Sequence, residues 1–497
     1  MKKVVAFFML MLLLFPMEVL GGKSGTPGNP GDWYVKDNPA NSDPSKAPIV
    51  FVHGLNSSSY TWWEKNDMYD IALEKGYETA FVDLYPVNDM WDNGSMLASM
   101  LGEIYEYFGE KPLVLVTHSK GGVDAQTALV HYGANKYVSN VFTLSSPHHG
   151  SQLADLAYSN WAGWLAEIIG NRNDGTYSLQ TGHMAYYRSL TDSHPDHSTN
   201  PIYTLAGTSW GVFGGVLFWG GLYLSQFGQN DGAVTVSSSR LDYGTEIAVG
   251  KWDHFLIVNG RATFDYFKPF FSADLHTNKA SSPQEEPEQG IGTILRGGEG
   301  KGIVKEVMTV EDDVEAVTFN YLSDVPLQGL SLTSPSGKSY SFDHVIDAQG
   351  EFFGAWQHLA RVAEPEAGEW VLTNRQTDTH PYFLAVQIEG GVANDLQVDL
   401  PKRKTATLKP SIQNRKINEQ TLSYDIQVSY TSADNPSASS QLQAVVSKNG
   451  QMNLPFNKEG SYTVTIDISG ETMNQIPFER TIVKNIYRDK KGSLHYN

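Results

Sequence analysis

The pattern of hydrophobic and polar residues differs between the two halves of the chain. In the first half, apolar runs contain few polar residues, which is typical of strands buried on both faces of a parallel sheet. These runs occupy residues 49–52, 78–82, 113–116, 141–144 and 202–205. Helical patterns at residues 62–75, 96–108 and 121–132 lie between them, and each is followed by a glycine that can cap a helix. This alternation predicts an α/β domain with right-handed crossovers.

The second half has the two-residue period of antiparallel strands. Apolar and polar side chains alternate along residues 422–430 and 462–468. Turn signals occur at residues 334–337, which read Ser-Pro-Ser-Gly, and at residues 449–450, which read Asn-Gly. These features predict all-β sandwich domains, Ig-like or jelly-roll-like, of about 100 residues each.

The N-terminus has the layout of a secretory signal peptide. Lys2 and Lys3 precede an apolar stretch at residues 4–15, and small or aliphatic residues follow. This stretch is shorter than the roughly 17 to 25 residues that a membrane-spanning helix needs. We therefore expect cleavage after Gly21 and a secreted protein, extracellular or associated with the cell wall. A retained membrane anchor is the alternative.

A change of composition separates the α/β region from the β-rich region. Residues 272–292 are rich in Ser, Pro, Glu and Gln and lack periodicity, which predicts a linker. The expected layout is therefore an α/β domain at residues 22–271, a β-sandwich at 293–395 and an Ig-like β-sandwich at 396–497.

Charge and cysteine content limit the chemistry. The 497 residues include 36 Lys and Arg against 55 Asp and Glu, a net charge of −19, which makes nucleic acid an improbable partner because its phosphates would be repelled. The chain has no cysteine, which excludes disulfides, thiolate metal sites and a cysteine nucleophile. A nucleophile on this chain would therefore be an oxygen.

One apolar run leads directly into a candidate nucleophile. The run at residues 113–116 is followed by Thr117, His118 and Ser119, and a helical pattern begins immediately afterwards with Gly121 and Gly122. A serine between a buried strand and a helix lies in a tight turn that exposes its hydroxyl group. The N-terminus of the following helix favours developing negative charge.

These residues resemble the α/β-hydrolase superfamily, and within it the secreted bacterial lipases and esterases. The resemblance covers about residues 45–270, and five segments carry it: Val52-His53-Gly54-Leu55, the turn at Ser119, Ser146-Pro147-His148-His149-Gly150, Asn230-Asp231-Gly232-Ala233-Val234 and Trp252-Asp253-His254. The family's elbow is usually Gly-x-Ser-x-Gly, and the first glycine is Thr117 here.

The resemblance implies a Ser-Asp-His triad. In the family's order, Asp231 is the acid that orients the base and His254 is the general base that takes the proton of Ser119. For Asp231 the alternative is an ordinary turn, and for His254 a histidine that caps a helix. Rival acids are Asp242 and Asp253, and rival bases are His149 and His276, all in loops that do not match the family.

The resemblance also implies an oxyanion hole formed by the backbone N–H groups of Leu55 and Lys120. Because these donors are backbone groups, we expect substitutions of the Lys120 side chain to have mild effects. We expect His53 and His118 to pack and form hydrogen bonds, and His148 and His149 to have structural or substrate-rim roles.

Two apolar insertions suggest the class of substrate. Residues 199–230 carry no charge and are rich in aromatic residues and glycine, and residues 153–169 are similarly apolar. Either a mobile flap that contacts lipid or an ordinary buried cap fits the first insertion, and both insertions favour an acyl-chain pocket.

A polar loop raises the question of a metal site. Asp192, His194, Asp196 and His197 crowd this loop, but their spacing fits no metal motif, and we expect a solvated loop with no metal. The position two residues after His254, where some bacterial lipases have a calcium ligand, is Leu256.

The sequence thus predicts a serine hydrolase of carboxylic esters, most simply a lipase or carboxylesterase, that needs no cofactor. Its substrate would be a small-molecule or lipid-aggregate ester, with interfacial contact through the apolar insertions. A polyester depolymerase and a non-catalytic surface-binding protein on a hydrolase scaffold remain the alternatives.

Overall fold

The computed structural model describes residues 28–41, 43, 45–162, 172–215, 217–271, 291–327, 329–346, 355–393, 396–398, 406–407, 410–412, 416–446, 451–453 and 456–496. The expected signal peptide, residues 272–290 of the expected linker, the Asn449-Gly450 turn and residues 163–169 of the second insertion lie outside these ranges, as does His276.

The first half of the chain forms one mixed sheet in the order β1-β3-β2-β4-β5-β6-β7, in which β1 is antiparallel to β3 and every other neighbouring pair is parallel. The strands are β1 (Trp33–Val35), β2 (Ile49–Val52), β3 (Thr79–Val82), β4 (Leu113–His118), β5 (Val138–Leu144), β6 (Ile202–Gly207) and β7 (Thr245–Gly250). The strands β2 to β6 lie at the five predicted runs, although β3 begins one residue later than expected, at Thr79. They are almost entirely buried, which confirms the α/β fold.

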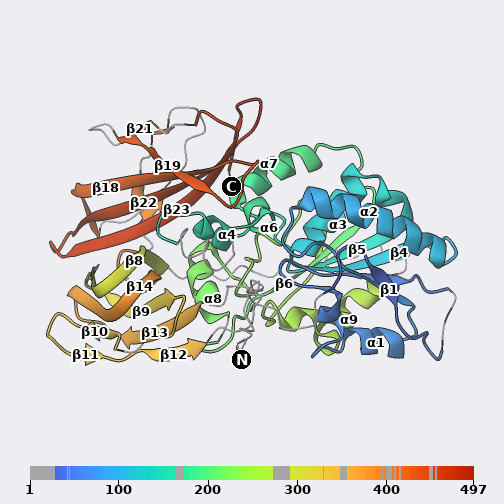
Figure 1. The fold of residues 1–497 in the computed structure, drawn as a ribbon, viewed down its shortest axis with the longest axis horizontal. Helices are drawn as coiled ribbons and strands as arrows, with labels where there is room; N and C mark the ends of the chain where they lie inside the picture. Colours follow the sequence, from blue (N-terminus) through green and yellow to red (C-terminus); the bar gives the residue numbers. More distant parts are fainter. Residues whose placement is uncertain are drawn as a thin grey trace, which may run out of the picture.

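Helices cover both faces of this sheet (Figure 1). The α-helices are α1 (Met68–Glu74), α2 (Met90–Tyr107), α3 (Lys120–His131), α4 (Gln152–Ala157), α6 (Asp174–Ser178), α7 (Thr181–Thr191), α8 (Phe218–Leu224) and α9 (Gly260–Phe267). The 3₁₀ helices are η1 (Ser59–Trp62), η2 (Ala134–Tyr137), η3 (Ser225–Phe227), η4 (Leu256–Val258) and η5 (Lys268–Phe270). Helices α1 and α9 share one apolar core with the sheet, and α2 and α3 share another on the opposite face.

Two helix boundaries differ from the sequence prediction. The helix expected at residues 62–75 is divided: η1 ends at Trp62, Lys65 has a positive φ of 56°, and α1 begins only at Met68, whose N–H donates to Asn66 Oδ1 at 2.7 Å. The helix expected at 96–108 begins at Met90, because the Asp89 carboxylate accepts hydrogen bonds from the next turn and caps it.

The second half of the chain is antiparallel β structure. One sheet has the order β11-β10-β14-β9-β13-β12, with β8 paired to β14, and another has the order β19-β18-β22-β23-β24. Shorter ladders join β15 to β17, and β21 to both β16 and β20. The strands are β8 (Ile291–Val310), β9 (Val314–Ser323), β10 (Ser331–Thr333), β11 (Ser339–Tyr340), β12 (Asp343–Ile346), β13 (Trp356–Ala363), β14 (Gly368–Gly390), β15 (Leu396–Val398), β16 (Ala406–Thr407), β17 (Pro410–Ile412), β18 (Ile417–Thr431), β19 (Ser439–Gln443), β20 (Val445–Val446), β21 (Gln451–Asn453), β22 (Gly460–Thr472), β23 (Pro477–Arg488) and β24 (Leu494–His495).

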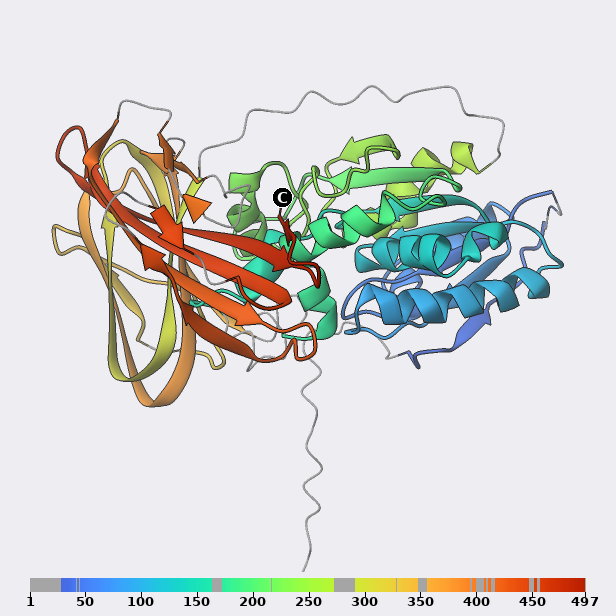
Figure 2. The same ribbon diagram turned by 90° about the horizontal axis from the view of Figure 1, so that it is seen from above.

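The two β-rich units lie together at one end of the molecule and pack against the helices that follow β5 and β6 (Figure 2). A buried ion pair between Arg480 of β23 and Glu311 joins the two units. We call the contact between these units and helices α4, α6, α7 and α8 the seam. One apolar cluster there contains α4, α8 and strands of both sheets: Leu153, Leu156, Ala162, Trp219, Tyr223, Leu224, Leu295, Leu322, Ala355, Phe383, Ala385 and Val483.

Candidate active site

Ser119 lies between the central strand β4 and helix α3. It has φ 52° and ψ −132°, a backbone conformation that a non-glycine residue adopts rarely and at a cost. Its N–H donates to the Leu144 carbonyl of β5 at 3.0 Å. The tight turn predicted from the sequence is therefore present, and it is anchored to the neighbouring strand. We call residues 117–122, together with His53 and Gly54, the elbow.

The glycines of the elbow are required by close backbone approach. A Cβ added to Gly121 would lie 2.2 Å from the His53 carbonyl oxygen, and one added to Gly122 would lie 2.1 Å from Ser146 Oγ. A Cβ on Gly54 would lie 2.7 Å from the Ser119 Cβ. The loop after β2 thus contacts both Ser119 and the start of α3.

Asp231 and His254 form a fully buried pair. Nδ1 of His254 and Oδ2 of Asp231 are 2.7 Å apart, and both side chains have no exposed surface. The other carboxylate oxygen, Oδ1, accepts from the N–H groups of Ala233 at 3.0 Å and Val234 at 2.8 Å. The His254 N–H donates to the Asp231 carbonyl at 3.0 Å. These bonds fix the imidazole with its Nδ1–H directed at the carboxylate.

The Asp231 carboxyl is held in its ionised form. Burial on its own raises the pKa of Asp231, but the charge and hydrogen bond of His254 and the N–H of Val234 outweigh it, so the pKa lies below the usual value of 3.8. An aspartate that stays ionised stabilises an imidazolium beside it, which is what a general base needs after it has taken a proton.

The neighbouring histidines make structural hydrogen bonds. The His118 ring packs on the His254 ring at 4.7 Å between centroids, and His118 Nε2 lies 2.9 Å from the His254 carbonyl oxygen. Burial lowers the pKa of His118 to about 3, so this ring is neutral and donates to that carbonyl. Nε2 of His53 accepts from the Leu84 N–H at 2.9 Å. Burial also lowers the pKa of His148 and His149.

The departure from the family's elbow is accommodated by one hydrogen bond. The Thr117 side chain is completely buried, and its hydroxyl donates to the Phe142 carbonyl of β5 at 3.1 Å. The β-branched residue therefore points toward the neighbouring strand and leaves the turn at Ser119 intact.

The Lys120 side chain contradicts the expectation of mild substitutions. It is 1% exposed, and its Nζ lies 2.6 Å from Asp124 Oδ1, one turn further along α3. Truncation of a lysine whose ammonium group is buried and paired strongly destabilises the fold, because the partner's charge remains in the interior.

The rival acids occupy other positions. The Asp253 carboxylate accepts from the N–H groups of Phe255 at 2.9 Å and Leu256 at 2.7 Å, so it caps the turn after His254. Asp231, in contrast, accepts from the turn that follows it and also reaches the imidazole. Asp231 thus also forms a turn, and His254 also precedes the short helix η4. Both local features exist beside the hydrogen bond between the two side chains.

The polar loop after α7 is engaged in local contacts. Asp192 pairs with Arg188 at 3.2 Å and accepts from the Tyr243 hydroxyl at 2.9 Å, and the His197 ring packs on Tyr243. Within the described part of the chain, no group of three or more His, Asp or Glu side chains is arranged to hold a metal ion.

The uncharged insertion before Asp231 forms helix α8. Its side chains Phe218, Trp219 and Leu222 are buried, and they contact Leu359 and Phe383 of the first β-rich unit. Just before the helix, Val212 is 78% exposed and Phe213 is 38% exposed. No helix among the described residues is long and apolar enough to cross a bilayer. The helical part of this insertion therefore has the buried-cap arrangement, whereas Val212 and Phe213, which precede the helix, are exposed.

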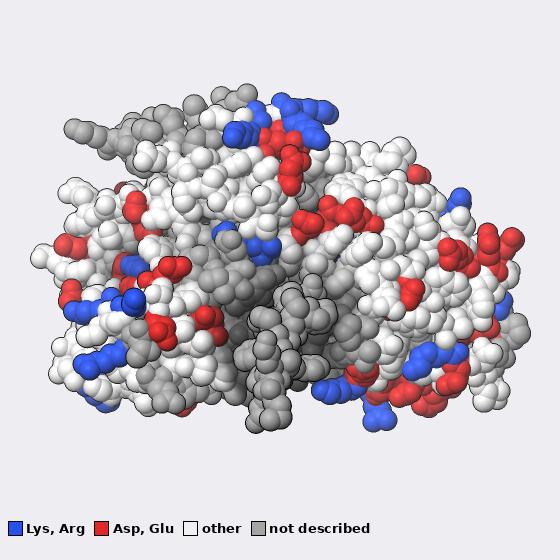
Figure 3. Space-filling model, viewed as in Figure 1, with Lys and Arg blue, Asp and Glu red and all other residues white. Residues whose placement is uncertain are grey.

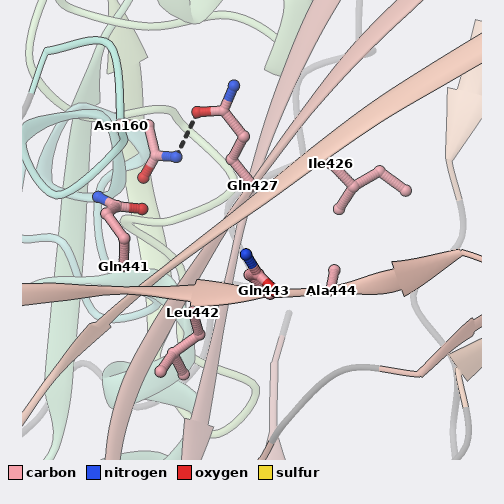
Figure 4. Close-up of a pocket in the computed structure, with 7 residues that line it drawn as sticks. All are labelled: Asn160, Ile426, Gln427, Gln441, Leu442, Gln443 and Ala444. Atoms are coloured by element: carbon pink, nitrogen blue, oxygen red, sulfur yellow. Dashed lines mark hydrogen bonds between the residues drawn. The ribbon is translucent and has the colours of Figure 1, made fainter.

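A groove with both amide and aliphatic side chains in its lining lies at the seam, and none of the proposed triad residues lines it. It has a volume of about 520 Å³ and is lined by Asn160 and residues 426–427 and 441–444 (Figure 4). The Asn160 amide donates to the Gln427 side chain across it. Its amide groups are unlike the lining of an acyl-chain site.

The chain is similar to lipases of known structure. A Bacillus licheniformis lipase, BlEst2, solved in its propeptide form, is 40% identical, and the match covers 95% of this chain and all of that one with a TM-score of 0.83. The mature form of the same lipase is 56% identical over 49% of this chain and all of its own, with a TM-score of 0.47. A metagenomic carboxyl esterase is 19% identical over 51% of this chain and 82% of its own, with a TM-score of 0.39. No protein-family profile and no curated protein sequence matches the chain.

Proposed function

The chain belongs to the lipases and esterases of the α/β-hydrolase fold, and from this premise we propose that it is a secreted serine hydrolase that cleaves lipid-like carboxylic esters. The observation that carries the proposal is the buried Asp231–His254 pair, 2.7 Å between Oδ2 and Nδ1, which follows strands β6 and β7 at the same edge of the sheet as Ser119. In a parallel sheet, this edge is where ligands bind.

Each residue of the triad has one part in the proposed reaction. Nε2 of His254 takes the proton of Ser119 Oγ as Oγ attacks the acyl carbon, and Asp231 stabilises the resulting imidazolium. The tetrahedral intermediate collapses, the ester's alcohol leaves with the proton from His254, and an acyl-enzyme remains. Water, deprotonated by His254, then releases the carboxylic acid and restores Ser119.

The proposed oxyanion donors are the N–H groups of Leu55 and Lys120. Lys120 is the first residue of α3, where backbone N–H groups point along the helix axis toward developing negative charge. Leu55 follows Gly54, whose backbone is in contact with Ser119. Loss of one such donor typically costs about 10² to 10³ in rate.

The apolar insertions support a lipid-like acyl group. The exposed Val212 and Phe213 precede α8 on the chain that leads to Asp231, so they provide apolar surface on an insertion of the catalytic domain. Acidic side chains gather on the end of the catalytic domain farthest from the β-rich units, together with some basic ones (Figure 3).

A polyester depolymerase uses the same chemistry on a solid substrate, whereas a non-catalytic binding protein would have no use for a buried Asp–His pair.

We also propose that the β-rich half acts as a propeptide, because the lipase similar to the whole chain was solved in its propeptide form. The seam supports this proposal. It buries apolar residues of α4 and α8 beneath strands of both units, so removal of these units would expose Trp219 and Tyr223 on the catalytic domain. Such a surface suits contact with a lipid aggregate.

A fluorophosphonate probe and a series of chromogenic esters test the function. The probe is expected to label the full chain once, at Ser119, and to leave Ser119→Ala unlabelled although folded. Hydrolysis is expected to extend to long acyl chains. An unlabelled but folded wild type would overturn the hydrolase proposal, and a sharp preference for short chains would overturn only the lipid preference.

Limited proteolysis between residues 272 and 290 tests the propeptide. The released catalytic part is expected to hydrolyse emulsified ester faster than the uncut chain, while soluble short-chain ester is cleaved at a similar rate by both. Equal rates on the emulsion before and after cleavage would contradict the proposal.

A further inference from the structure

A buried network connects the two residues proposed to supply the oxyanion hole. It begins at the Lys120 side chain, whose Nζ lies 2.6 Å from Asp124 Oδ1. The other oxygen, Asp124 Oδ2, accepts from the side-chain amide of Asn93 at 3.0 Å. All three side chains are at most 3% exposed. The Lys120 side chain thus takes part in this buried network, while the Lys120 backbone N–H is the proposed oxyanion donor.

Asn93 passes the connection to the segment that follows β3. Its amide nitrogen donates to the Tyr85 carbonyl at 3.0 Å, and its oxygen accepts from the Tyr85 N–H at 3.1 Å. The Asn93 side chain therefore binds both the N–H and the carbonyl of Tyr85. Because Asn93 also binds Asp124, these bonds fix the position of the segment after β3 relative to α3.

The same segment holds the other side of the oxyanion hole. The Asn56 N–H donates to the Pro86 carbonyl at 2.8 Å, and the Leu84 N–H donates to His53 Nε2 at 2.9 Å. These two bonds lie on either side of Gly54 and Leu55. Asn56 has a positive φ of 51°, so the loop reverses immediately after Leu55 and depends on this anchor.

We infer that Lys120, Asp124 and Asn93 are positioning residues that set the separation of the Leu55 and Lys120 backbone donors; this rests on the proposed function. A stabilising role alone does not need this arrangement, because apolar side chains of similar size in place of a buried ion pair are often as stable. Unlike apolar packing, the hydrogen bonds of this network fix the positions of particular groups. They connect the end of the nucleophile turn to the loop after β2 through the segment that follows β3.

The double substitution Lys120→Met with Asp124→Leu separates the two roles. It removes both charges and retains the volume, so folding and Tm are expected to stay near wild type. The kcat for a soluble short-chain ester is expected to fall by about 10- to 100-fold, less than the loss of a whole donor, with KM nearly unchanged. The pH dependence of kcat is expected to keep its shape, because the network does not touch His254 or Asp231.

A second variant keeps the test decisive if the double variant fails to fold. Asn93→Leu keeps Lys120 and Asp124 but removes the hydrogen bonds of Asn93 to Asp124 and to Tyr85, which breaks the connection to the segment after β3. A loss of kcat of roughly 3- to 10-fold with unchanged KM is expected. The control is Leu129→Ala, a buried residue near the other end of α3, which is expected to lower Tm and leave kcat unchanged.

Binding of a boronic acid, which forms a tetrahedral anion on the serine, completes the test. Its affinity is expected to fall in parallel with kcat in both network variants and to stay constant in Leu129→Ala. Wild-type kcat in a folded double variant would overturn the inference. A wild type that neither hydrolyses esters nor binds the probe would overturn the proposed function instead.

Discussion

The elbow and the seam are both built on close backbone contact, yet they draw on different parts of the chain. At the elbow, Gly121 lies against the carbonyl of His53, and both residues belong to the catalytic domain. At the seam, the Gly182 N–H donates to Asn485 Oδ1 at 3.1 Å, across 303 positions of the sequence. The proposed chemistry is therefore contained in the first half of the chain, whereas the surroundings of α4, α7 and α8 depend on the second half.

The two regions also differ in what they bury. The elbow buries polar groups that are held by specific contacts: the Thr117 hydroxyl donates to the Phe142 carbonyl, and the Lys120 ammonium group pairs with Asp124. The seam buries mainly apolar side chains, and aromatic contacts add to them: Tyr487 of β23 stacks on Tyr186 of α7 at 4.8 Å between ring centroids. Burial of apolar area stabilises without fixing direction, and hydrogen bonds fix direction at the cost of desolvation. This contrast is consistent with the two proposals: an active site whose groups are fixed by hydrogen bonds, and a propeptide that packs against the catalytic domain through apolar surface.

The largest expected effect comes from Asp231→Asn at the catalytic edge. The amide keeps the size of the side chain but removes the charge that stabilises a protonated His254, so kcat for a soluble ester is expected to fall by about 10⁴-fold. Stopped or continuous ester assays measure this loss, with Asp253→Asn, in the neighbouring turn, as the matched control. A comparable loss in the control would show that the wrong aspartate has been assigned.

The second prediction places a methyl group at each contact. Gly121→Ala would bring Cβ to 2.2 Å from the His53 carbonyl oxygen, and Gly182→Ala would bring it to 2.5 Å from Asn485 Oδ1 and 2.7 Å from the Tyr487 N–H. Gly121→Ala is expected to lower both Tm and kcat, the latter by at least about 10²-fold, because the nucleophile turn must move. Gly182→Ala is expected to leave the short-ester kcat within about twofold and to weaken only the seam.

Ester assays and susceptibility to proteolysis at residues 272–290 measure the two effects. If Gly182→Ala abolished hydrolysis of a soluble ester, the catalytic domain would depend on the seam, and the separation of the two regions would be wrong.

The third prediction concerns a carboxyl group buried at the seam. Asp155 of α4 accepts from the Thr181 N–H at 2.8 Å and from the Thr181 hydroxyl at 2.7 Å, and burial raises its pKa to about 7 against these bonds. Below about pH 4 the group is protonated in the folded and unfolded chains alike. As pH rises toward 7, only the unfolded chain loses this proton, so the free energy of unfolding falls by a few kcal/mol and stays lower above pH 7.

Asp155→Asn removes this titration. The difference in Tm between pH 5 and pH 8 is expected to become smaller than in wild type, with Tm at pH 8 higher than wild type. Asp434→Asn, at an exposed loop of the β-rich region, is the control and is expected to keep the wild-type difference. An unchanged pH dependence in Asp155→Asn would mean that this carboxyl is ionised in the folded chain.

The sequence was sufficient where a function depends on consecutive residues. The run of apolar residues, Ser119 and two glycines predicts a strand, a strained turn and a helix, because the local pattern alone determines that geometry. The pairing of Asp231 with His254 came from resemblance to a family, since 23 positions and a sheet strand separate the two residues and no local pattern connects them.

Other features required partners that are distant in the sequence. Lys120 and Asp124, four residues apart on a helix, are typical of an exposed ion pair. Their burial and the contact of Asp124 with Asn93 of α2 appear only in the structure. The insertion that contains α8 was equally compatible with a flap or a cap, because its partners Leu359 and Phe383 lie more than a hundred residues further along the chain. Amphipathic pattern shows that a face is buried, not what buries it.

The smallest expected effect tests how tightly the elbow depends on Thr117, where the family usually has glycine. Thr117→Ala removes the hydroxyl that donates to the Phe142 carbonyl at 3.1 Å, and Thr117→Val removes it with the volume retained. Both are expected to cost about 1 kcal/mol of stability, the usual value of one such bond, and to keep kcat within about threefold. Thermal unfolding and ester assays measure the two quantities. The hydroxyl joins β4 to β5 through the Phe142 carbonyl. A loss of kcat beyond about 10²-fold in both variants would mean that it takes part in positioning Ser119, and that the elbow depends on its neighbouring strand.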